Sequence, residues 1–541
     1  MNKIPVLIAG GGPVGLSLAC DLSWRGIEAI LVEKSTSTTS YPKMDVTNSR
    51  TMEHFRRMGI ADKIRAAAVP DDHAMHCRWV TDLAGWELSV KALESPADQR
   101  ELIRVANDGT QPVEPHVRMP QYDLEPLLKS VVDNTESGID VRFGWSLESF
   151  EQNDTGVTSI IRNTQTGEKQ SIDSEYLVGT DGGNSVVRKG LGIRYEGIPR
   201  GMRLFMIHFL TDEYEKLMPF GPAWHVHLMK TNSVLISQDD QRSFTLHTVL
   251  DPTADSAAID PAEWLATQLG VEIDCEIKIA EEWTAHWLVA RKYGEGRVWL
   301  AGDSAHQYLP TGGYGMNTGV PDAMDVSWKV AAMLQGWGGD DLLDTITVER
   351  RAAGLHSRRG SLGQAEERAI VMMQLNPAIV HEGEEGDEAR GQASAALEGM
   401  ISDERGNPGV SLGYSYADSP IVCFESASPP ANSIWNYSPT TYAGYRAPHV
   451  FLEDGSAIYD HFGSGFTLIN FGGHDTSLFE QAAANCKMPL QVLNLNEQHA
   501  HSIYKKDLLL IRPDQHVAWR ADASPPVPEE AERVINLVRG A

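Results

Sequence analysis

Two glycine-rich motifs, far apart in the chain, constrain this sequence more than any other feature. The first is GGGPVG at residues 10–15, directly after the apolar run 4–9, and the second is AGDSAH at residues 301–306, after residues 297–300. A short apolar run that ends in turn residues is typical of a buried parallel strand. Each motif therefore lies where such a strand ends, and together they predict one large nucleotide cofactor that is bound at both ends.

The first motif matches the dinucleotide-binding fingerprint, in which each glycine has its own role. Gly10 allows the strand to turn sharply into a helix, Gly12 lets a pyrophosphate approach the backbone, and Gly15 lets the helix pack closely on the strand. The helix predicted to begin at Pro13 and Val14 would direct free N–H groups and its positive dipole end at the phosphates.

An acidic residue completes this fingerprint. Glu33 ends the second apolar run, residues 29–32, at the distance of about twenty residues that the motif expects. Its carboxylate would accept hydrogen bonds from an adenosine ribose, and its charge would repel a 2′-phosphate. We include the neighbouring Lys34 in the same candidate site.

Composition excludes several classes of partner. The 541 residues allow about three or four domains of ordinary size. The net charge of −28, from 46 basic and 74 acidic residues, argues against a nucleic-acid or anionic-membrane partner. The five cysteines form no CxxC and have no metal-ligand spacing, so we predict neither disulfides nor a metal, and a reducing, cytoplasmic location.

Targeting segments are also disfavoured. Lys3, the apolar stretch after it and the Ala-Cys pair at residues 19–20 could imitate a secretory leader, but three consecutive glycines would weaken its helix and cleavage would remove the fingerprint. No other run approaches the ~18 apolar residues of a membrane span. The acidic, glycine-containing residues 380–410 are interpreted as an exposed connection before a separate C-terminal domain.

The chain resembles the FAD-dependent aromatic hydroxylases, the single-component flavoprotein monooxygenases that include p-hydroxybenzoate hydroxylase and phenol 2-monooxygenase. The resemblance runs over almost the whole length. It is carried by residues 10–15, 48–53 (NSRTME), 120–125 (PQYDLE), 179–188 (GTDGGNSVVR), 302–306 (GDSAH), 310–319 (PTGGYGMNTG) and 512–520 (RPDQHVAWR).

This resemblance implies an α/β fold with a Rossmann-like FAD-binding domain, an inserted β-sheet substrate domain and a C-terminal thioredoxin-like domain. The expected boundaries are 1–75, 100–185 and 290–400 for the discontinuous FAD-binding domain, 76–99 and 186–289 for the substrate domain, and 405–541 for the third domain. Because the third domain lacks a CxxC, we expect it to serve packing or formation of a homodimer, with no redox chemistry.

The resemblance also implies how FAD is held. Asp303 would accept hydrogen bonds from the ribityl hydroxyls, although such a residue alone is more often a helix cap. Gln121 would contact the phosphate–ribityl stretch. The helix that begins near Met316 and Asn317 would direct backbone N–H groups at the flavin C2 carbonyl, where reduced flavin carries negative charge. The remaining candidate cofactor-binding residues are Lys43, Arg50, Arg118, Asp181, Pro310, Gly313 and Gly315.

Three of these residues have qualified roles. Lys43 stands where many relatives have arginine, so it keeps the charge but loses the bidentate fork. Arg50 would either order its loop or reach a phosphate. Asp181 belongs to an element that serves both FAD and transient NAD(P)H binding in the family. No second GxGxxG is present, so NADPH or NADH is expected to bind without a Rossmann domain of its own.

The implied chemistry is hydroxylation of a phenolic ring with NAD(P)H and O2. Reduced flavin takes up oxygen as a C4a-hydroperoxide, which transfers one oxygen atom to an electron-rich ring. Since free phenols titrate near ~10, a positioned base would help. Asp45 is the candidate, because it precedes Arg50 as a catalytic aspartate does in phenol 2-monooxygenase; alternatively, it only orders the loop.

The substrate surface is expected between Arg188 and Trp299. His225 and His227 would share one face of a strand and could bind a phenol or relay its proton, or could be ordinary buried polar residues. No third ligand at suitable spacing supports a metal site there. Residues 283–287 (WTAHW) are a second candidate wall, although we favour a core role.

Three other functions remain open from the sequence. The same fold could carry out epoxidation or Baeyer–Villiger oxidation of a polycyclic substrate. It could also be an FAD dehydrogenase or reductase that does not use oxygen, or a nucleotide fold kept only for binding. The substrate itself is not specified by these motifs.

Overall fold

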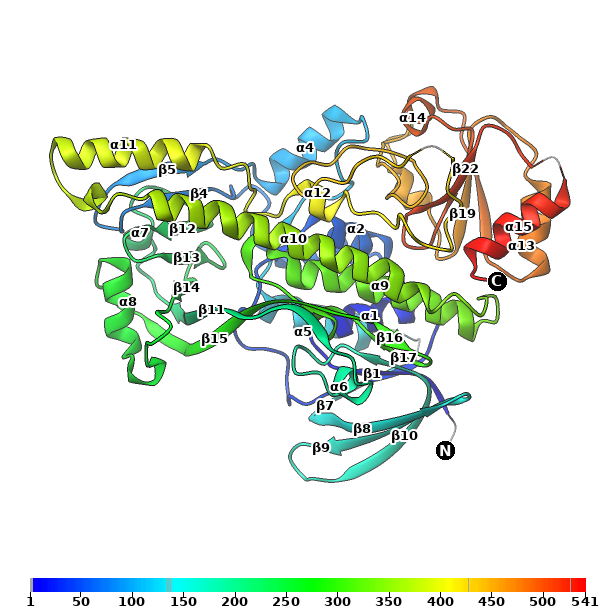
Figure 1. The fold of residues 1–541 in the computed structure, drawn as a ribbon, viewed down its shortest axis with the longest axis horizontal. Coiled ribbons are helices and arrows are strands. Elements are labelled where there is room, and N and C mark those ends of the chain that lie inside the picture. Colours follow the sequence, from blue (N-terminus) through cyan, green and yellow to red (C-terminus); the bar gives the residue numbers. More distant parts are fainter. Residues whose placement is uncertain (1–2, 134–135, 137, 427, 526) are drawn as a thin grey trace.

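Three large β-sheets and one two-stranded sheet organise the described part of the molecule (Figure 1). The computed structural model describes residues 3–133, 136, 138–426, 428–525 and 527–541. The first sheet has eight strands, and its central path runs in the order β16-β17-β10-β1-β2-β7. Strand β1 (Ile4–Ala9) pairs in parallel with β2 (Ala29–Glu33) and β10 (Lys169–Gly179), and β10 pairs in parallel with β17 (Val298–Leu300). The two glycine-rich motifs therefore leave the same edge of one sheet, as the apolar runs predict.

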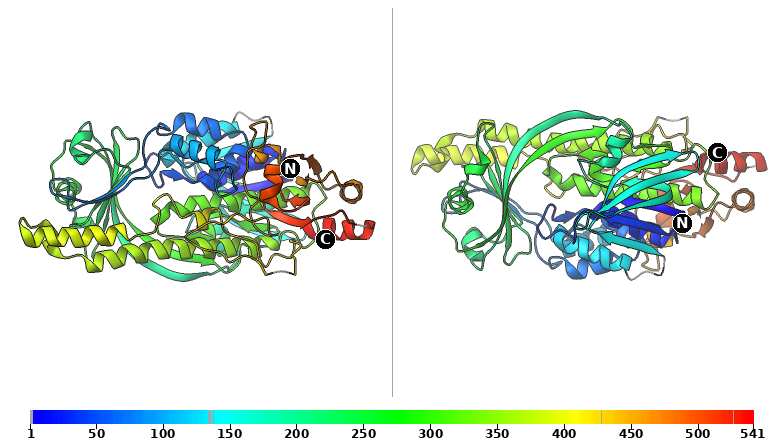
Figure 2. Two further views of the ribbon diagram at one scale, coloured as in Figure 1. Left: turned by 90° about the horizontal axis from the view of Figure 1, so that it is seen from above. Right: turned by 90° about the horizontal axis from the view of Figure 1, so that it is seen from below.

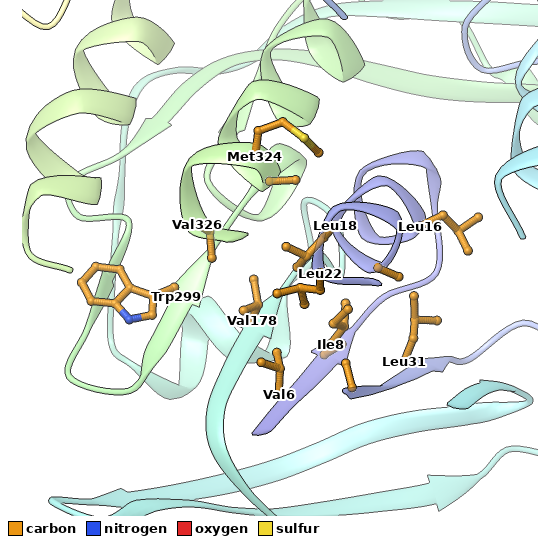
Figure 3. Close-up of a cluster of buried hydrophobic side chains, with 14 of the residues drawn as sticks. Val6, Ile8, Leu16, Leu18, Leu22, Leu31, Val178, Trp299, Met324 and Val326 are labelled. Carbon is orange, nitrogen blue, oxygen red and sulfur yellow. The ribbon is translucent and has the colours of Figure 1, made fainter. Parts of the chain in front are cut away.

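Helices α1 (Pro13–Trp24) and α9 (Tyr314–Leu334) cover this sheet side by side (Figure 3). Ile8 and Val178 point from the strands toward Leu18 and Leu22 of α1 and Val326 of α9, and all five are fully buried. The other elements of this region are β7 (Ile139–Phe143), β8 (Trp145–Asn153), β9 (Gly156–Asn163), β16 (Gly294–Glu295), α2 (Ser49–Arg57), α3 (Ala61–Ala67), α5 (Gln121–Asp133), α6 (Val186–Gly190) and the pair β3 (Val46–Thr47) and β6 (Val117–Arg118).

The second sheet also has eight strands, in the order β18-β15-β11-β14-β13-β12-β4-β5. It unites β4 (Cys77–Val80) and β5 (Glu87–Lys91) with the strands of the 186–289 region through the parallel pair β12–β4. The strands of that region, with short β18, are β11 (Tyr195–Leu210), β12 (His225–Leu228), β13 (Ser233–Ser237), β14 (Ser243–Val249), β15 (Glu276–Ala290) and β18 (His306–Gln307).

Helices cover this sheet unequally. Helix α8 (Pro261–Leu269) lies against β15, and its Leu265 and Leu269 are buried in the hydrophobic core of this sheet. The long helix α10 (Thr345–Gln374) runs from this sheet toward the C-terminal domain (Figure 2). Three shorter helices elsewhere in the chain are α4 (Pro96–Ala106), α7 (Tyr214–Leu217) and α12 (Pro408–Ser411).

Residues 380–410 are not the exposed connection that their composition suggested. They contain helix α11 (Glu384–Glu398), which packs against β5. Ala389, Ala393 and Leu397 recur every four residues, so the helix buries one narrow apolar face. The acidic residues that dominate this segment lie mostly on the opposite, solvent-exposed face.

The third sheet has four strands in the order β20-β19-β21-β22 and forms the core of the C-terminal domain. Strand β19 pairs in parallel with β20 and antiparallel with β21, an arrangement consistent with the thioredoxin-like domain that the resemblance implies. Its elements are β19 (Phe466–Asn470), α13 (Ser477–Asn485), β20 (Leu490–Asn494), α14 (Gln498–Tyr504), β21 (Leu508–Ile511), β22 (Val517–Ala521) and α15 (Pro528–Val538). Among the described residues, no helix combines the length and apolar character needed to span a bilayer.

Candidate functional site

One large cavity connects the first sheet with the second. Its volume is about 960 Å³, at the upper end of the range of about 300–1,000 Å³ for small-molecule sites. Both glycine-rich motifs reach it, through Gly12 and Asp303, and so do His225 and His227 of the second sheet. The fold therefore brings the predicted cofactor motifs and the predicted substrate surface to a single space.

The surroundings of Gly10 and Gly15 leave no room for a side chain, in agreement with the packing roles that the motif gives these two glycines. A Cβ on Gly10, whose φ is +113°, would lie 2.4 Å from the carbonyl oxygen of Thr180, and one on Gly15 would lie 2.0 Å from that of Gly10. A Cβ on Gly12 would have no neighbour closer than 4.0 Å. Helix α1 begins at Pro13 without a side-chain cap, so its first N–H groups remain available at the cavity beside Val14.

Glu33 lies behind this turn and does not line the cavity. Its carboxylate accepts hydrogen bonds from the backbone N–H of Gly11 at 2.8 Å and of Ser35 at 2.9 Å. Each carboxylate oxygen has a second lone pair for a ribose hydroxyl. Lys34 is exposed and also lies outside the cavity lining.

The second motif presents a carboxylate with no hydrogen-bond donor among the described residues. Asp303 reaches the cavity, and desolvation within the fold raises its pKa even though His306 and Lys43 oppose this shift. Lys43 lines the same cavity and lies 5.1 Å from the ring centroid of Tyr41. A ligand hydroxyl that donates to Asp303 would satisfy this carboxylate.

The start of helix α9 forms an open platform. Gly313 precedes the helix with φ +62° and provides no side-chain cap. Gly315 has no atom within 4 Å of the position that a Cβ would take, and it lines the cavity together with Met316 and Pro310. Backbone N–H groups of the first turn are thus free to meet a ligand oxygen.

Asn317 supports the start of α9, whereas Gln121 belongs to the cavity wall. The amide of Asn317 accepts from Asn48 N at 2.9 Å and donates to the carbonyl oxygens of Val46 and Gly313 at 3.0 and 2.7 Å, so it fixes the platform from behind. Gln121 lines the cavity directly and donates to Glu125 at 2.6 Å.

Arg50 lies outside the cavity. Its guanidinium donates to Glu53 at 2.8 Å, to the carbonyl oxygen of Asp514 at 2.7 Å and to Gln515 at 2.6 Å. Of its two expected roles, the structure supports the ordering one. The contact joins the NSRTME segment to the RPDQHVAWR segment of the C-terminal domain.

Arg118 and Asp181 are also engaged within the protein. Arg118 forms a bidentate pair with Asp240, with two contacts of 2.7 Å, and does not line the cavity. Asp181 accepts from the backbone N–H of Val186 at 2.6 Å at the start of α6, while its Oδ1 has no hydrogen-bond partner within the described part of the chain. The neighbours of Asp181, at residues 180 and 182, line the cavity.

Asp45 lies in the cavity wall between the two sheets. Its Oδ2 accepts a hydrogen bond of 2.5 Å from the indole Nε1 of Trp224, and its own carbonyl accepts from Met119 N. The indole thus fixes one of the two carboxylate oxygens of Asp45.

His225 and His227 share one face of β12, as their spacing predicts, and both line the cavity. His227 stacks on Trp79 with ring centroids 4.9 Å apart, and burial lowers its pKa to about 3. Glu404 approaches both rings, at 3.7 Å from Nδ1 of His225 and 3.8 Å from Nε2 of His227. Sequence spacing therefore missed a third side chain that could join a metal site.

Helix α10 and the segment after α11 complete the cavity wall, and sequence reasoning missed their contribution. Arg368 of α10 forms an ion pair with Glu404, which is 5% exposed. Nothing in the local sequence separates Glu404 from the exposed acidic residues around it. Trp283, which we expected in the core, also lines the cavity, whereas Trp287 packs in a buried cluster.

Comparison with known proteins agrees with this architecture. Residues 3–358 match the family described as FAD binding domain, and residues 440–540 match the aromatic-ring hydroxylase C-terminal domain. The chain belongs to this family of FAD-dependent monooxygenases.

Individual relatives cover the whole chain. The FAD-dependent monooxygenase apdD of Emericella nidulans is 34% identical over 573 aligned residues, which cover 100% of this chain and 91% of that protein. The structure of RebC-10x, native and bound to K252c, has a TM-score of 0.90 at 34% identity and full coverage of both chains. A ternary complex of aklavinone-11 hydroxylase with FAD and aklavinone has a TM-score of 0.85 at 27% identity, again with full coverage of both chains.

Proposed function

We propose that this protein hydroxylates a phenolic ring in an extended aromatic substrate, using FAD, NADPH or NADH, and O2. The observation that carries the proposal is the single cavity, which has a dinucleotide cradle at one end and Asp45 in its wall facing the second sheet. The similarity to hydroxylases of polycyclic compounds supports the substrate size.

The described residues fit an FAD. The open space at Gly12 and the uncapped start of α1 suit the pyrophosphate. The unpartnered carboxylate of Asp303 suits the ribityl hydroxyls, and the clear surface at Gly315 suits the flat ring with its C2 carbonyl toward the N–H groups of α9. FAD, when bound, supplies the reaction with O2 and the transfer of one oxygen atom.

The chain itself would bind, orient and deprotonate the substrate. Asp45, held by Trp224, would accept the proton of the phenolic hydroxyl at its other carboxylate oxygen, which enriches the ring in electrons. The apolar wall excludes water and so protects the oxygen transfer. It is rich in methionine and tryptophan: Met44, Met202, Met206, Met229, Met316, Met372, Met373, Met400, Trp79, Trp224 and Trp283.

The first experiment mixes FAD-loaded protein with NADH or NADPH in air and a panel of phenols, naphthols and larger polycyclic phenols. We expect ligand-stimulated flavin reduction and a product that is heavier by one oxygen atom from ¹⁸O2. An epoxide or ring-expanded product would instead select the alternative oxygen insertions. Turnover under argon with another electron acceptor, without oxygen in the product, would select a dehydrogenase, and a protein that binds no FAD would refute the proposal.

A further inference from the structure

A buried polar cluster on the second sheet is not used by the proposed oxygen chemistry. It consists of His225, His227, Glu404 and Arg368, and we call it the histidine–glutamate cluster. All four side chains line the cavity, although they come from β12, from α10 and from the segment after α11. Convergence of three separate elements on one point of a cavity wall is typical of a ligand-recognition site.

Two members of the cluster have unused hydrogen-bonding capacity. Both ring nitrogens of His225 and Nε2 of His227 are buried without a hydrogen-bond partner among the described residues. His227 is only 6% exposed. Their distances to Glu404, 3.7 and 3.8 Å, are too long for hydrogen bonds. Because unpaired buried polar atoms are costly, a ligand that supplies the missing partners would gain affinity.

The charge state of the cluster decides which partners suit it. Burial alone would raise the pKa of Glu404, but Arg368 and the two imidazoles hold this pKa well below its usual range. Glu404 is therefore a carboxylate, which only accepts hydrogen bonds. Burial keeps His227 neutral, with one donor and one acceptor nitrogen. The cluster therefore suits an uncharged hydroxyl group, which can both donate and accept.

The rest of the cavity wall gives no compensation for an anionic substrate. Its acidic residues are Asp45, Glu281, Asp303 and Glu404, and its basic residues are Lys43 and Arg368. Arg368 is already paired with Glu404, and Lys43 lies at the cofactor end with Asp303. A substrate carboxylate placed at the cluster would face Glu404, and among the described residues of the cluster no lysine or arginine is left unpaired to receive it.

We propose that the histidine–glutamate cluster recognises an uncharged hydroxyl on the substrate and rejects a carboxylate at the same place. The hydroxyl donates to Glu404 and accepts from an imidazole N–H, while Arg368 balances the charge of Glu404. The substrate class is thus a neutral, extended, polyhydroxylated aromatic compound. This inference rests on the proposed function for the reaction, but its test requires only binding.

A metal ion is the competing occupant, and the geometry disfavours it. The candidate ligand atoms of His225, His227 and Glu404 lie within 4.8 Å of one another, but Arg368 already provides the cation for the carboxylate. A zinc ion would need all three atoms at about 2.0–2.2 Å and would have to displace the guanidinium.

The test compares two ligands that share a ring system: a dihydroxynaphthalene, and the hydroxynaphthoic acid with a carboxyl in place of one hydroxyl. Each is titrated at neutral pH into oxidised, FAD-loaded protein without NAD(P)H, and perturbation of the flavin spectrum gives the dissociation constant. We expect the diol to bind at least about ten-fold more tightly, the effect of one hydrogen bond to a charged group. Equal affinities, or tighter binding of the acid, would overturn the proposal.

Variants locate the discrimination. Glu404→Gln should reduce the preference for the diol to within about three-fold, whereas Glu281→Gln, which removes a carboxylate elsewhere in the same wall, should leave it intact. Equal effects of the two substitutions would contradict a local site. His227→Asn is a second variant, for the case that Glu404→Gln folds poorly, and it keeps a polar side chain. It is expected to weaken binding of the diol about ten-fold without strengthening binding of the acid.

Equilibrium dialysis with ZnCl2 tests whether the histidine–glutamate cluster binds a metal ion instead. Stoichiometric zinc that is lost in both His225→Ala and His227→Ala would assign the cluster to a metal and overturn the proposal. Absence of zinc, together with the diol preference, supports it. Failure of the proposed hydroxylation shows separately, as tight binding of the diol without oxygen incorporation.

Discussion

At the scale of single residues, Asp45, His225 and His227 all lie in the cavity wall as candidates for the catalytic base. Burial lowers the pKa of His227 to about 3, so this imidazole is a weak acceptor for a phenolic proton. Asp45 lies in the same cavity with one carboxylate oxygen fixed by Trp224. We propose that Asp45 accepts the proton and that His227 recognises the substrate by hydrogen bonding.

Replacing Asp45 with asparagine tests this assignment. The amide oxygen can still accept from Trp224, but the base is lost, so product formation in a single turnover should fall by about 10²–10⁴-fold. FAD content and ligand affinity should stay within about three-fold, because the cradle is untouched. Stopped-flow reduction followed by product quantification measures the single turnover, and the flavin spectrum gives the FAD content and the ligand affinity.

Two further variants serve as controls. Trp224→Phe removes the indole donor and keeps the carboxylate, so its loss of product should be clearly smaller. His227→Asn should raise KM more than it lowers kcat. If Asp45→Asn retained the wild-type rate while His227→Asn abolished it, the two roles would be reversed.

The residues that sequence could identify are those whose role is local. The fingerprint glycines act on the backbone of their own turn, and the alternation of His225 and His227 follows from strand geometry. Glu404 was beyond such reasoning because its partner Arg368 is remote in the chain. An ordering role was among the expectations for Arg50, but its remote partners Asp514 and Gln515 could not be predicted.

At the scale of elements, the turn between β1 and α1 offers a matched pair of substitutions. Gly12→Ala adds a methyl group with no neighbour closer than 4.0 Å, whereas Gly15→Ala places it 2.0 Å from the carbonyl oxygen of Gly10. We expect Gly12→Ala to leave the unfolding temperature of the apoprotein within about 2 °C while weakening FAD by more than about ten-fold.

Gly15→Ala should instead destabilise the apoprotein itself by about 1–3 kcal/mol, since the helix must move away from the strand. Thermal unfolding with and without FAD distinguishes the two variants. Unchanged FAD affinity in a folded Gly12→Ala protein would show that the pyrophosphate does not approach this glycine.

Strands and helices were predictable from the sequence where their apolar residues form one clear pattern. The apolar runs before the two motifs form the parallel strands β1 and β17, which lie on either side of β10. They were recognisable because both faces of that sheet are buried. Helix α11 was missed because its buried residues are Gly386, Ala389, Ala393 and Leu397, and such small residues in an acidic segment give a weak helical pattern.

At the scale of the whole molecule, buried ion pairs hold the C-terminal domain against the FAD-binding domain. Arg446 pairs with Glu53 of α2, and Arg512 pairs with Glu349 of α10, and all four side chains are excluded from solvent. Such pairs contribute little net stability when intact but strongly destabilise a protein when one partner is removed. They make the two domains depend on each other.

This dependence predicts the response to acid. Burial alone would raise the pKa of Glu53, but Arg446 and Arg50 lower this pKa from its ordinary 4.5 to about 2. A depressed acid pKa contributes stability that is complete above the unfolded-state value of 4.5 and is lost as the pH falls through about 2. By linkage this shift corresponds to about 3 kcal/mol, which wild-type protein should lose across that window.

Glu53→Gln should remove this contribution to the pH dependence. Its free energy of unfolding should be lower at pH 7 by about 3–5 kcal/mol, because Arg446 stays buried without its counter-ion, and should vary less between pH 4.5 and pH 2 than that of the wild type. Asp460→Asn is the matched control, since Asp460 pairs with Arg56 at the same domain boundary but is 36% exposed; it should cost about 0–1 kcal/mol. Urea unfolding across this pH range measures both variants, and a wild-type acid dependence in Glu53→Gln would place the domain linkage elsewhere.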